Sequence, residues 1–180
     1  ATSALVTRSN NQELMQANLN LAAAFGAPLT WLLGGFNDTR SFNSAALNVG
    51  VPMIAAELGG GGGTDPIEVS HALTGLKRCL AHVGIIKQTL PTAPPSIFVE
   101  TRSIADNIYA PLTGLFDRQF KAGDQIEKGQ LAGYIRSLDK LDDAPVPLHF
   151  STNGHVLAHG NRGHVMRGDM LAMVVCETHI

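Results

Sequence analysis

The sequence predicts an α/β sheet domain followed by an all-β domain. The first half alternates helix-like and strand-like segments, whereas the second half consists of short strands separated by glycines. Helices alternating with strands are typical of a sheet covered by helices, and short, regularly spaced strands are typical of sandwiches and barrels. A proline-rich stretch lies between the halves and cannot continue a helix. We therefore predict a domain at residues 1–89, a linker at 90–96 and a β domain at 97–180.

Helix and strand signals follow one another through the first half. Asn10 and Glu13 form a capping-box pattern, apolar residues then recur at helical spacing, and Gly26 and Pro28 end the helix after Phe25. The elements predicted next are a strand at residues 29–33, a short helix at 42–47, a strand at 51–57 and a helix that starts at Asp65.

The most informative stretch is the predicted strand at residues 51–57, which ends in Glu57 and continues into the glycines at 59–63. We expect this strand to be buried. Asp65 then serves as a helix N-cap, and Glu68 closes its capping box. In open α/β sheets, ligands bind beyond the carboxyl ends of the strands. Glu57 is therefore a candidate for chemistry; the alternative is a tight turn in which it only caps a neighbouring group.

The helix that starts at Asp65 has an apolar face and stops at Gly84. The residues of that face are Val69, Leu73, Leu76, Leu80 and Val83. Only two strands are predicted in this half, both of the parallel type, and two strands are too small a sheet to stand alone. The chain also begins at Ala1, without a methionine and just before a helix. We therefore expect a missing N-terminal segment of the same protein, with pairing to that segment or self-association at the open edge.

Composition excludes several classes of protein. The 180 residues carry a net charge near −2, which gives no basic surface for nucleic acid or anionic membranes. No apolar run reaches the ~20 residues of a membrane span, and no signal peptide is visible. Cys79 and Cys176 are far apart and form no disulfide framework. We expect a cytoplasmic protein.

The second half contains a repeat. Gly114 corresponds to Gly154, Ile126 to Val165, and residues 128–129 to 167–168. The pattern indicates two interlocking β halves and resembles the barrel-sandwich hybrid of lipoyl and biotinyl carrier domains. In that fold, the modified lysine lies between the halves, where this chain has Lys140. A carrier or binding module without hydrolytic activity is therefore the alternative to an enzyme.

An ordered set of motifs extends over nearly the whole chain. They lie at residues 24–28, 50–52, 56–60, 81–84, 110–116 and 123–124. This order resembles the C-terminal portion of the succinylglutamate desuccinylase/aspartoacylase family, with its carboxypeptidase-like sheet domain and trailing β domain. The branch most similar to it includes N-acetyl-diaminobutyrate deacetylases.

The resemblance implies a zinc-dependent amidohydrolase that removes the acyl group from a small N-acyl amino acid. Glu57 matches the family's general base and acid, and Arg40 is a candidate clamp for the substrate carboxylate. Gly59 and Gly60 would let the backbone approach the substrate closely. The chain contains no H-x-x-E motif, so we expect the zinc ligands in a segment preceding Ala1 and no metal site here.

Three histidines lie close together in the second half. They are His155, His159 and His164. Surrounding glycines indicate strands and turns rather than the convergent geometry of a zinc site, so we interpret all three as surface residues.

Overall fold

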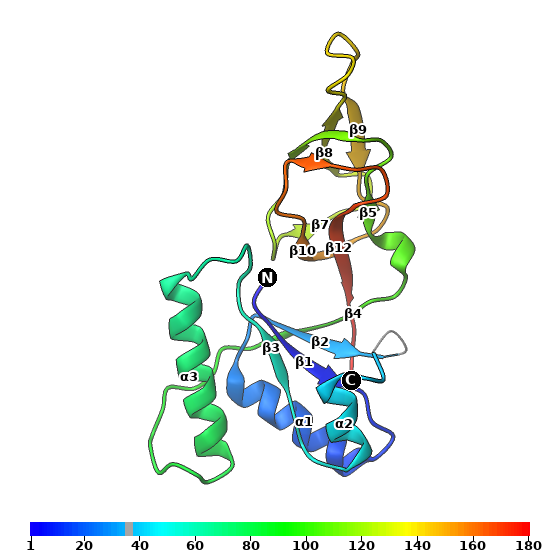
Figure 1. Cartoon of the computed structure of the whole chain (residues 1–180). Coiled ribbons are helices and arrows are strands. Elements are labelled where there is room, and N and C mark those ends of the chain that lie inside the picture. The colour runs from blue at the N-terminus through cyan, green and yellow to red at the C-terminus, as the bar shows by residue number, and fades with distance from the viewer. Residues whose placement is uncertain (35–37) are drawn as a thin grey trace. The chain divides into compact units, whose positions relative to one another are not determined.

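The computed structural model describes residues 1–34 and 38–180. They form two compact units, residues 1–100 with 178–180 and residues 101–177. Within these described ranges, no helix is both long enough and apolar enough to cross a lipid bilayer. The elements of the first unit (Figure 1) are β1 (Ser3–Thr7), α1 (Gln12–Phe25), β2 (Leu29–Leu33), α2 (Phe42–Asn48), β3 (Ala55–Glu57), α3 (Pro66–His82) and β4 (Ile97–Glu100).

The strands of the first unit lie in the order β3-β1-β2-β4. β1 is parallel to β2, with Ser3 opposite Leu29, and β2 is parallel to β4, with Leu29 opposite Ile97. β3 is antiparallel to β1, with Glu57 opposite Ser3. β4 lies within the residues 97–180 that we predict as the β domain, but its pairing with β2 groups it by contacts with the first unit.

Two predictions about this sheet are wrong. β1 was missed because its sequence SALVT is buried on both faces and therefore lacks the alternation that marks a half-buried strand. The segment at 51–57 is not a buried parallel strand: only Ala55–Glu57 are in β3, Val51 and Pro52 are exposed, and β3 runs antiparallel to its neighbour. Among the described strands β3 lies at one end of the order, so one edge of its backbone is unpaired there.

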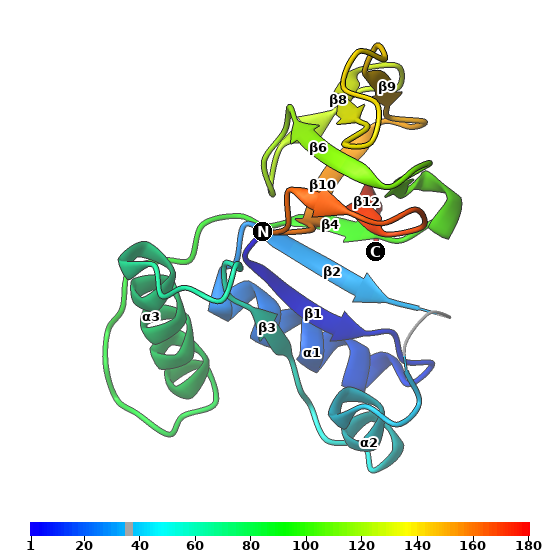
Figure 2. The ribbon, with the colours of Figure 1, turned by 45° about the horizontal axis from the view of Figure 1, so that its top comes forward.

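Helix α1 forms the core of the first unit against the sheet (Figure 2). Its N-cap is Asn11, whose side chain accepts hydrogen bonds from the N–H groups of Glu13 and Leu14, one residue after the predicted cap. Gly26 ends the helix with a left-handed φ of 75°. The buried residues of this core are Ala4, Val6, Leu19, Ala22, Phe25, Ala27 and Leu32.

The second unit is built from short antiparallel strands. They are β5 (Ile108–Tyr109), β6 (Gly114–Arg118), β7 (Gln125–Ile126), β8 (Leu131–Arg136), β9 (Val146–His149), β10 (Gly154–His159), β11 (His164–Val165) and β12 (Met170–Glu177), preceded by a 3₁₀ turn at Ile104–Asp106. β6 pairs with β8, and the equivalent β10 pairs with β12. β11 and β9, which come from the second half of this unit, flank the β6–β8 pair. β7 and β5, which come from its first half, flank the β10–β12 pair. Each half thus completes the sheet of the other.

Equivalent residues in the two halves of the predicted repeat make the same hydrogen bonds. The N–H of Glu127 donates to Gln130 Oε1 at 2.9 Å, and the N–H of Met166 donates to Asp169 Oδ2 at 2.8 Å. A Cβ added at Gly114 or at Gly154 would in both cases meet a backbone carbonyl of the neighbouring strand at 2.2 Å. The two glycines are therefore equivalent points of close strand approach.

Candidate functional site

Glu57 is the last residue of β3 and is exposed. Because β3 is antiparallel to β1, Glu57 lies beside the start of β1 and not beside the carboxyl ends of β1 and β2. Contrary to our prediction, Glu57 therefore does not lie in a crevice beyond the carboxyl ends of the parallel strands of this sheet. What remains is a carboxylate at an open sheet edge, followed at once by the glycine segment.

A polar cluster lies beside this end of the sheet. Thr2 is buried; its Oγ1 donates a hydrogen bond to Glu68 Oε2 and accepts one from the N–H of Gly59 at 2.9 Å. His71 Nδ1 lies 3.8 Å from Glu68 Oε2. The cluster therefore ties the N-terminal strand, the glycine segment and α3 together.

The predicted capping chemistry at α3 is present in part. Asp65 is the N-cap, and its Oδ1 accepts from the N–H of Ile67 at 2.7 Å, with Pro66 in the first turn. Glu68, which we expected to close a capping box, instead has its carboxylate on Thr2. This contact has no local signal in the sequence, because Thr2 and Glu68 are 66 residues apart.

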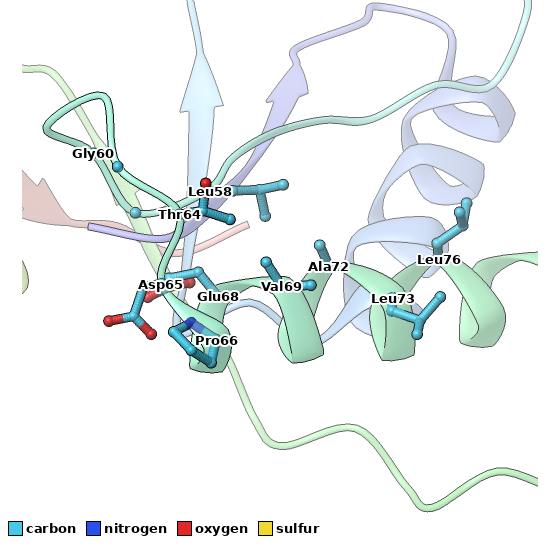
Figure 3. Close-up of a pocket in the computed structure, with 12 residues that line it drawn as sticks. Leu58, Gly60, Thr64, Asp65, Pro66, Glu68, Val69, Ala72, Leu73 and Leu76 are labelled. Carbon is cyan, nitrogen blue, oxygen red and sulfur yellow. The ribbon is translucent and has the colours of Figure 1, made fainter.

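The glycine segment borders an open groove along α3 (Figure 3). Gly59 has a left-handed φ of 64°, and an added Cβ there would lie 3.1 Å from Glu68 Cγ, so a side chain is disfavoured on both counts. Gly60 is exposed and lines the groove with Gly59. The groove has a volume of about 780 Å³. Its apolar lining is contributed by Leu58, Val69, Ala72, Leu73 and Leu76.

The groove and Glu57 belong to different faces of the sheet. Directly opposed residues of antiparallel strands have their side chains on the same face, and successive residues alternate. Ala4 packs into the core under α1, so its partner Ala56 faces the helices, whereas Ser3 and its partner Glu57 face the other way. The predicted catalytic residue and the predicted glycines Gly59 and Gly60 are neighbours in sequence, but the groove does not include Glu57.

Arg40 lies just before α2, and its guanidinium is already engaged. Nε and Nη2 donate to the two carboxylate oxygens of Asp38 at 3.1 and 2.9 Å. Hydrogen bonding from Arg40 lowers the pKa of Asp38, and that carboxylate raises the pKa of Arg40. Residues of α2 line a small pocket with Thr7 at the end of β1, whereas Glu57 is opposite Ser3 at the start of β1. Ser3 and Thr7 are about 13 Å apart along the strand at roughly 3.3 Å per residue. The structure thus does not bring Arg40 and Glu57 together.

The histidines of the second unit do not converge on a metal. His155 is buried, contrary to the expectation of a surface residue, and its Nε2 lies 2.9 Å from Glu177 Oε1. His159 Nδ1 instead contacts the carbonyl oxygen of Gly160 at 2.9 Å. Over residues 1–34 and 38–180, no three His, Cys, Asp or Glu side chains are grouped as a metal site. The residues described here therefore do not fit a complete zinc site.

Lys140 is exposed in the loop between the paired strands β8 and β9. Its backbone N–H donates to Ser137 Oγ at 3.2 Å, and its carbonyl accepts from the N–H of Asp143 at 3.2 Å. The lysine thus lies in an exposed hairpin loop.

The architecture of the chain, an α/β unit followed by a β unit of two interlocked halves, is similar to part of solved succinylglutamate desuccinylase/aspartoacylase structures. No protein-family model matches the chain. A solved structure of that description from Rhodobacter sphaeroides is 28% identical, with a TM-score of 0.87 over 98% of this chain and 54% of the other. The ectoine utilization protein EutE of Ruegeria pomeroyi has the same fold, with a TM-score of 0.88 at 23% identity. The match covers 98% of this chain and 53% of EutE.

Another relative carries a specific activity and substrate in its name. The N-alpha-acetyl-L-2,4-diaminobutyric acid deacetylase of Halomonas elongata is 25% identical over 166 residues, which is 92% of this chain and 48% of that protein. The resemblance to desuccinylase/aspartoacylase proteins that the sequence motifs predicted is therefore confirmed. The chain spans about half the length of the relatives it matches.

Proposed function

We propose that this chain is the C-terminal portion of a zinc-dependent amidohydrolase that removes the acyl group from a small N-acyl amino acid. The observation that carries the proposal is the match of 98% of the chain to the Rhodobacter sphaeroides desuccinylase/aspartoacylase, supported by the deacetylase from Halomonas elongata. Because the chain spans about half of these proteins, it is expected to be inactive alone.

Glu57 is the proposed proton-transfer residue of this chain. A carboxylate serves as general base when it can accept a proton from the attacking water, and as general acid when it returns that proton to the leaving amine. The exposed position of Glu57 at the end of β3 leaves its carboxylate accessible to a substrate. Gly60 would let the backbone approach the substrate closely, whereas the N–H of Gly59 would first have to leave Thr2. Arg40 would have to exchange Asp38 for the substrate carboxylate and move toward Glu57, because the structure does not bring the two together.

Zinc remains part of the proposal although the described residues do not fit a complete site. We propose that its ligands lie in a segment preceding Ala1, within the half of the relatives that this chain does not span.

A fusion protein tests this function. It joins the chain to the part of the Rhodobacter sphaeroides relative that the chain does not match, in the order of that relative. We expect it to bind zinc and to release free amine from N-alpha-acetyl-L-2,4-diaminobutyric acid or N-succinylglutamate. Glu57→Gln should lower turnover about 100-fold or more with bound zinc unchanged, since general acid–base catalysis contributes roughly 10²–10⁴-fold. Glu13→Gln, in the exposed first turn of α1, is the matched control. Turnover within threefold of the control would remove Glu57 from the mechanism.

The second unit and the location of the protein are also proposals. We propose that the second unit is a barrel-sandwich hybrid, supported by the exchange of flanking strands between its two halves. Free Cys79 and Cys176 favour the reducing cytoplasm.

The alternative function, a carrier domain, is favoured by the exposed loop position of Lys140. Mass spectrometry of the native protein distinguishes it, because a carrier has added mass on Lys140 and a hydrolase does not.

A further inference from the structure

The small pocket at the end of β1 brings polar side chains from three elements of the first unit together. Its lining residues are Thr7, Asn18, Asn43, Ala46, Leu47, Val51 and Met53. The pocket has a volume of about 10 Å³. Roughly 10–15 Å³ is the space that a single water molecule needs in a protein, provided that it finds two to four polar partners. The polar side chains of the lining therefore decide whether water suits the pocket.

Thr7 contributes a hydroxyl that lacks a partner. The residue is 8% exposed, and its Oγ1 is fully buried without a hydrogen bond to any described residue. Such a hydroxyl is costly, because folding removes its hydrogen bonds to solvent and returns none. The wall of a pocket of water size thus contains one unsatisfied polar atom.

Two amides supply further partners. The N–H of Met53 donates to Asn18 Oδ1 at 2.8 Å. Because a backbone N–H can only donate, this bond fixes the orientation of the Asn18 amide and leaves its two Nδ2 hydrogens for another acceptor. Asn18 is 4% exposed, so bulk solvent is largely excluded from that role. Asn43, in the first turn of α2, adds an amide that can donate or accept.

We propose that this pocket is a binding site for one ordered water molecule. The water shares a hydrogen bond with Thr7 Oγ1, accepts one from Asn18 Nδ2 and contacts the Asn43 amide. It thereby ties the end of β1 to α1 and α2. Through the bond from Met53 to Asn18, it also supports the segment that leads into β3. The inference goes beyond the proposed function and does not depend on it, since every group it uses lies in the first unit.

A metal cation is the competing occupant, and the lining makes it the poorer one. Hard cations such as Ca²⁺ take roughly six to eight oxygen ligands, with carboxylates prominent among them. The described lining of the pocket contains neither Asp nor Glu. The group that Asn18 has left to offer is an N–H donor, which repels a cation. A neutral molecule that both donates and accepts fits these groups better.

The sign of one substitution tests the site. Thr7→Val replaces the hydroxyl by a methyl group of similar size. With water bound, the change removes one partner of that water, and the equilibrium constant of unfolding should rise about fivefold, as for the loss of one hydrogen bond. In a dry pocket, the same change removes an unsatisfied hydroxyl, and the constant should fall. Urea titration of the full chain, followed by the fluorescence of the single tryptophan Trp31 in β2, measures this constant for the first unit.

Ser3→Ala is the matched control. Ser3 Oγ is also a buried β1 hydroxyl with no hydrogen bond to a described residue, but Ser3 does not line this pocket. Its removal should leave the constant of unfolding unchanged or lower it. Opposite signs for the two variants would therefore support the water site.

A crystal structure of the unsubstituted chain gives a second readout that does not depend on how the variants fold. We expect one water within about 3.2 Å of Thr7 Oγ1 and of an amide atom of Asn18 or Asn43. A dry pocket or a metal ion in it would overturn the proposal. So would a Thr7→Val variant that is as stable as Ser3→Ala or more stable.

Discussion

Alanine at the two equivalent glycines of the second unit should destabilise it by similar amounts. In Gly114→Ala the new Cβ would lie 2.2 Å from the carbonyl oxygen of Arg136, and in Gly154→Ala 2.2 Å from that of Val175. Carbon and oxygen atoms in contact need more than about 3 Å, so each strand pair must separate by about 1 Å. The obstacle in each case is backbone held in a ladder, β6–β8 or β10–β12, and not a flexible side chain.

The expected loss is about 2 kcal/mol or more for each variant. Overpacking of a close contact costs roughly 1–3 kcal/mol, and rigid backbone places these sites at the upper end. Removing a glycine from the unfolded chain offsets about 0.4–1 kcal/mol of that cost. Gly160→Ala is the control, because its added Cβ would meet only the carbonyl oxygen of Met170, at an ordinary 3.5 Å. It should be neutral or slightly stabilising.

The assay must report on the second unit specifically. The single tryptophan, Trp31, is in β2 of the first unit, so its fluorescence is the wrong probe. Amide exchange of peptides from residues 101–177 reads that unit directly, and a loss of about 2 kcal/mol corresponds to exchange roughly 30 times faster. If Gly114→Ala exchanges within threefold of Gly160→Ala, the close approach is relieved at little cost and the reasoning fails. A large effect at Gly114 with none at Gly154 would contradict their equivalence.

Two further predictions concern the first unit. Thr2→Val leaves the N–H of Gly59 and the carboxylate of Glu68 without their shared partner, so the free energy of unfolding should fall by about 1–3 kcal/mol in urea titration; an unchanged midpoint would show that water replaces Thr2. Arg40→Gln should raise the pKa of Asp38 toward its ordinary value, measured by NMR titration of the carboxyl carbon. The sign follows from the contact: the Arg40 pair stabilises the charged carboxylate, so its contribution is present above the ordinary pKa of Asp38 and is lost as the pH falls through the lowered one. A pKa that stays low in Arg40→Gln would mean another group holds it down.

Local signals in the sequence were sufficient for the helices and for the repeat. Gly26 ends α1, Asp65 caps α3, and the pairs Gly114/Gly154 and Ile126/Val165 occupy equivalent places in the two β halves. Each of these features depends on residues a few positions apart, or on a motif that recurs. Capping, left-handed glycines and repeated glycine-bounded strands are therefore visible without knowledge of the fold.

The sheet of the first unit could not be predicted in the same way, because strand direction and register depend on contacts that are distant in sequence. β1 carries serine and threonine at buried positions, and no alternation distinguishes it from a loop. No pattern within residues 51–57 predicts that β3 is antiparallel to β1. That direction determines at which end of the sheet Glu57 lies. The candidate site was thus predicted as a set of residues, but its geometry was not.

The apolar face of α3 was predicted correctly from the spacing of its residues, but the sequence did not indicate that this face is half exposed. The spacing of Val69, Leu73 and Leu76 predicted one apolar face, and the structure places all three on the groove. Full burial of a leucine side chain is worth roughly 1.5–3 kcal/mol, so two half-exposed leucines leave about that much stabilisation unused. In this chain α3 is held instead by Gly75 on Phe25 and by Glu68 on Thr2. The position of α3 in this unit therefore rests on these two contacts and not on its apolar face.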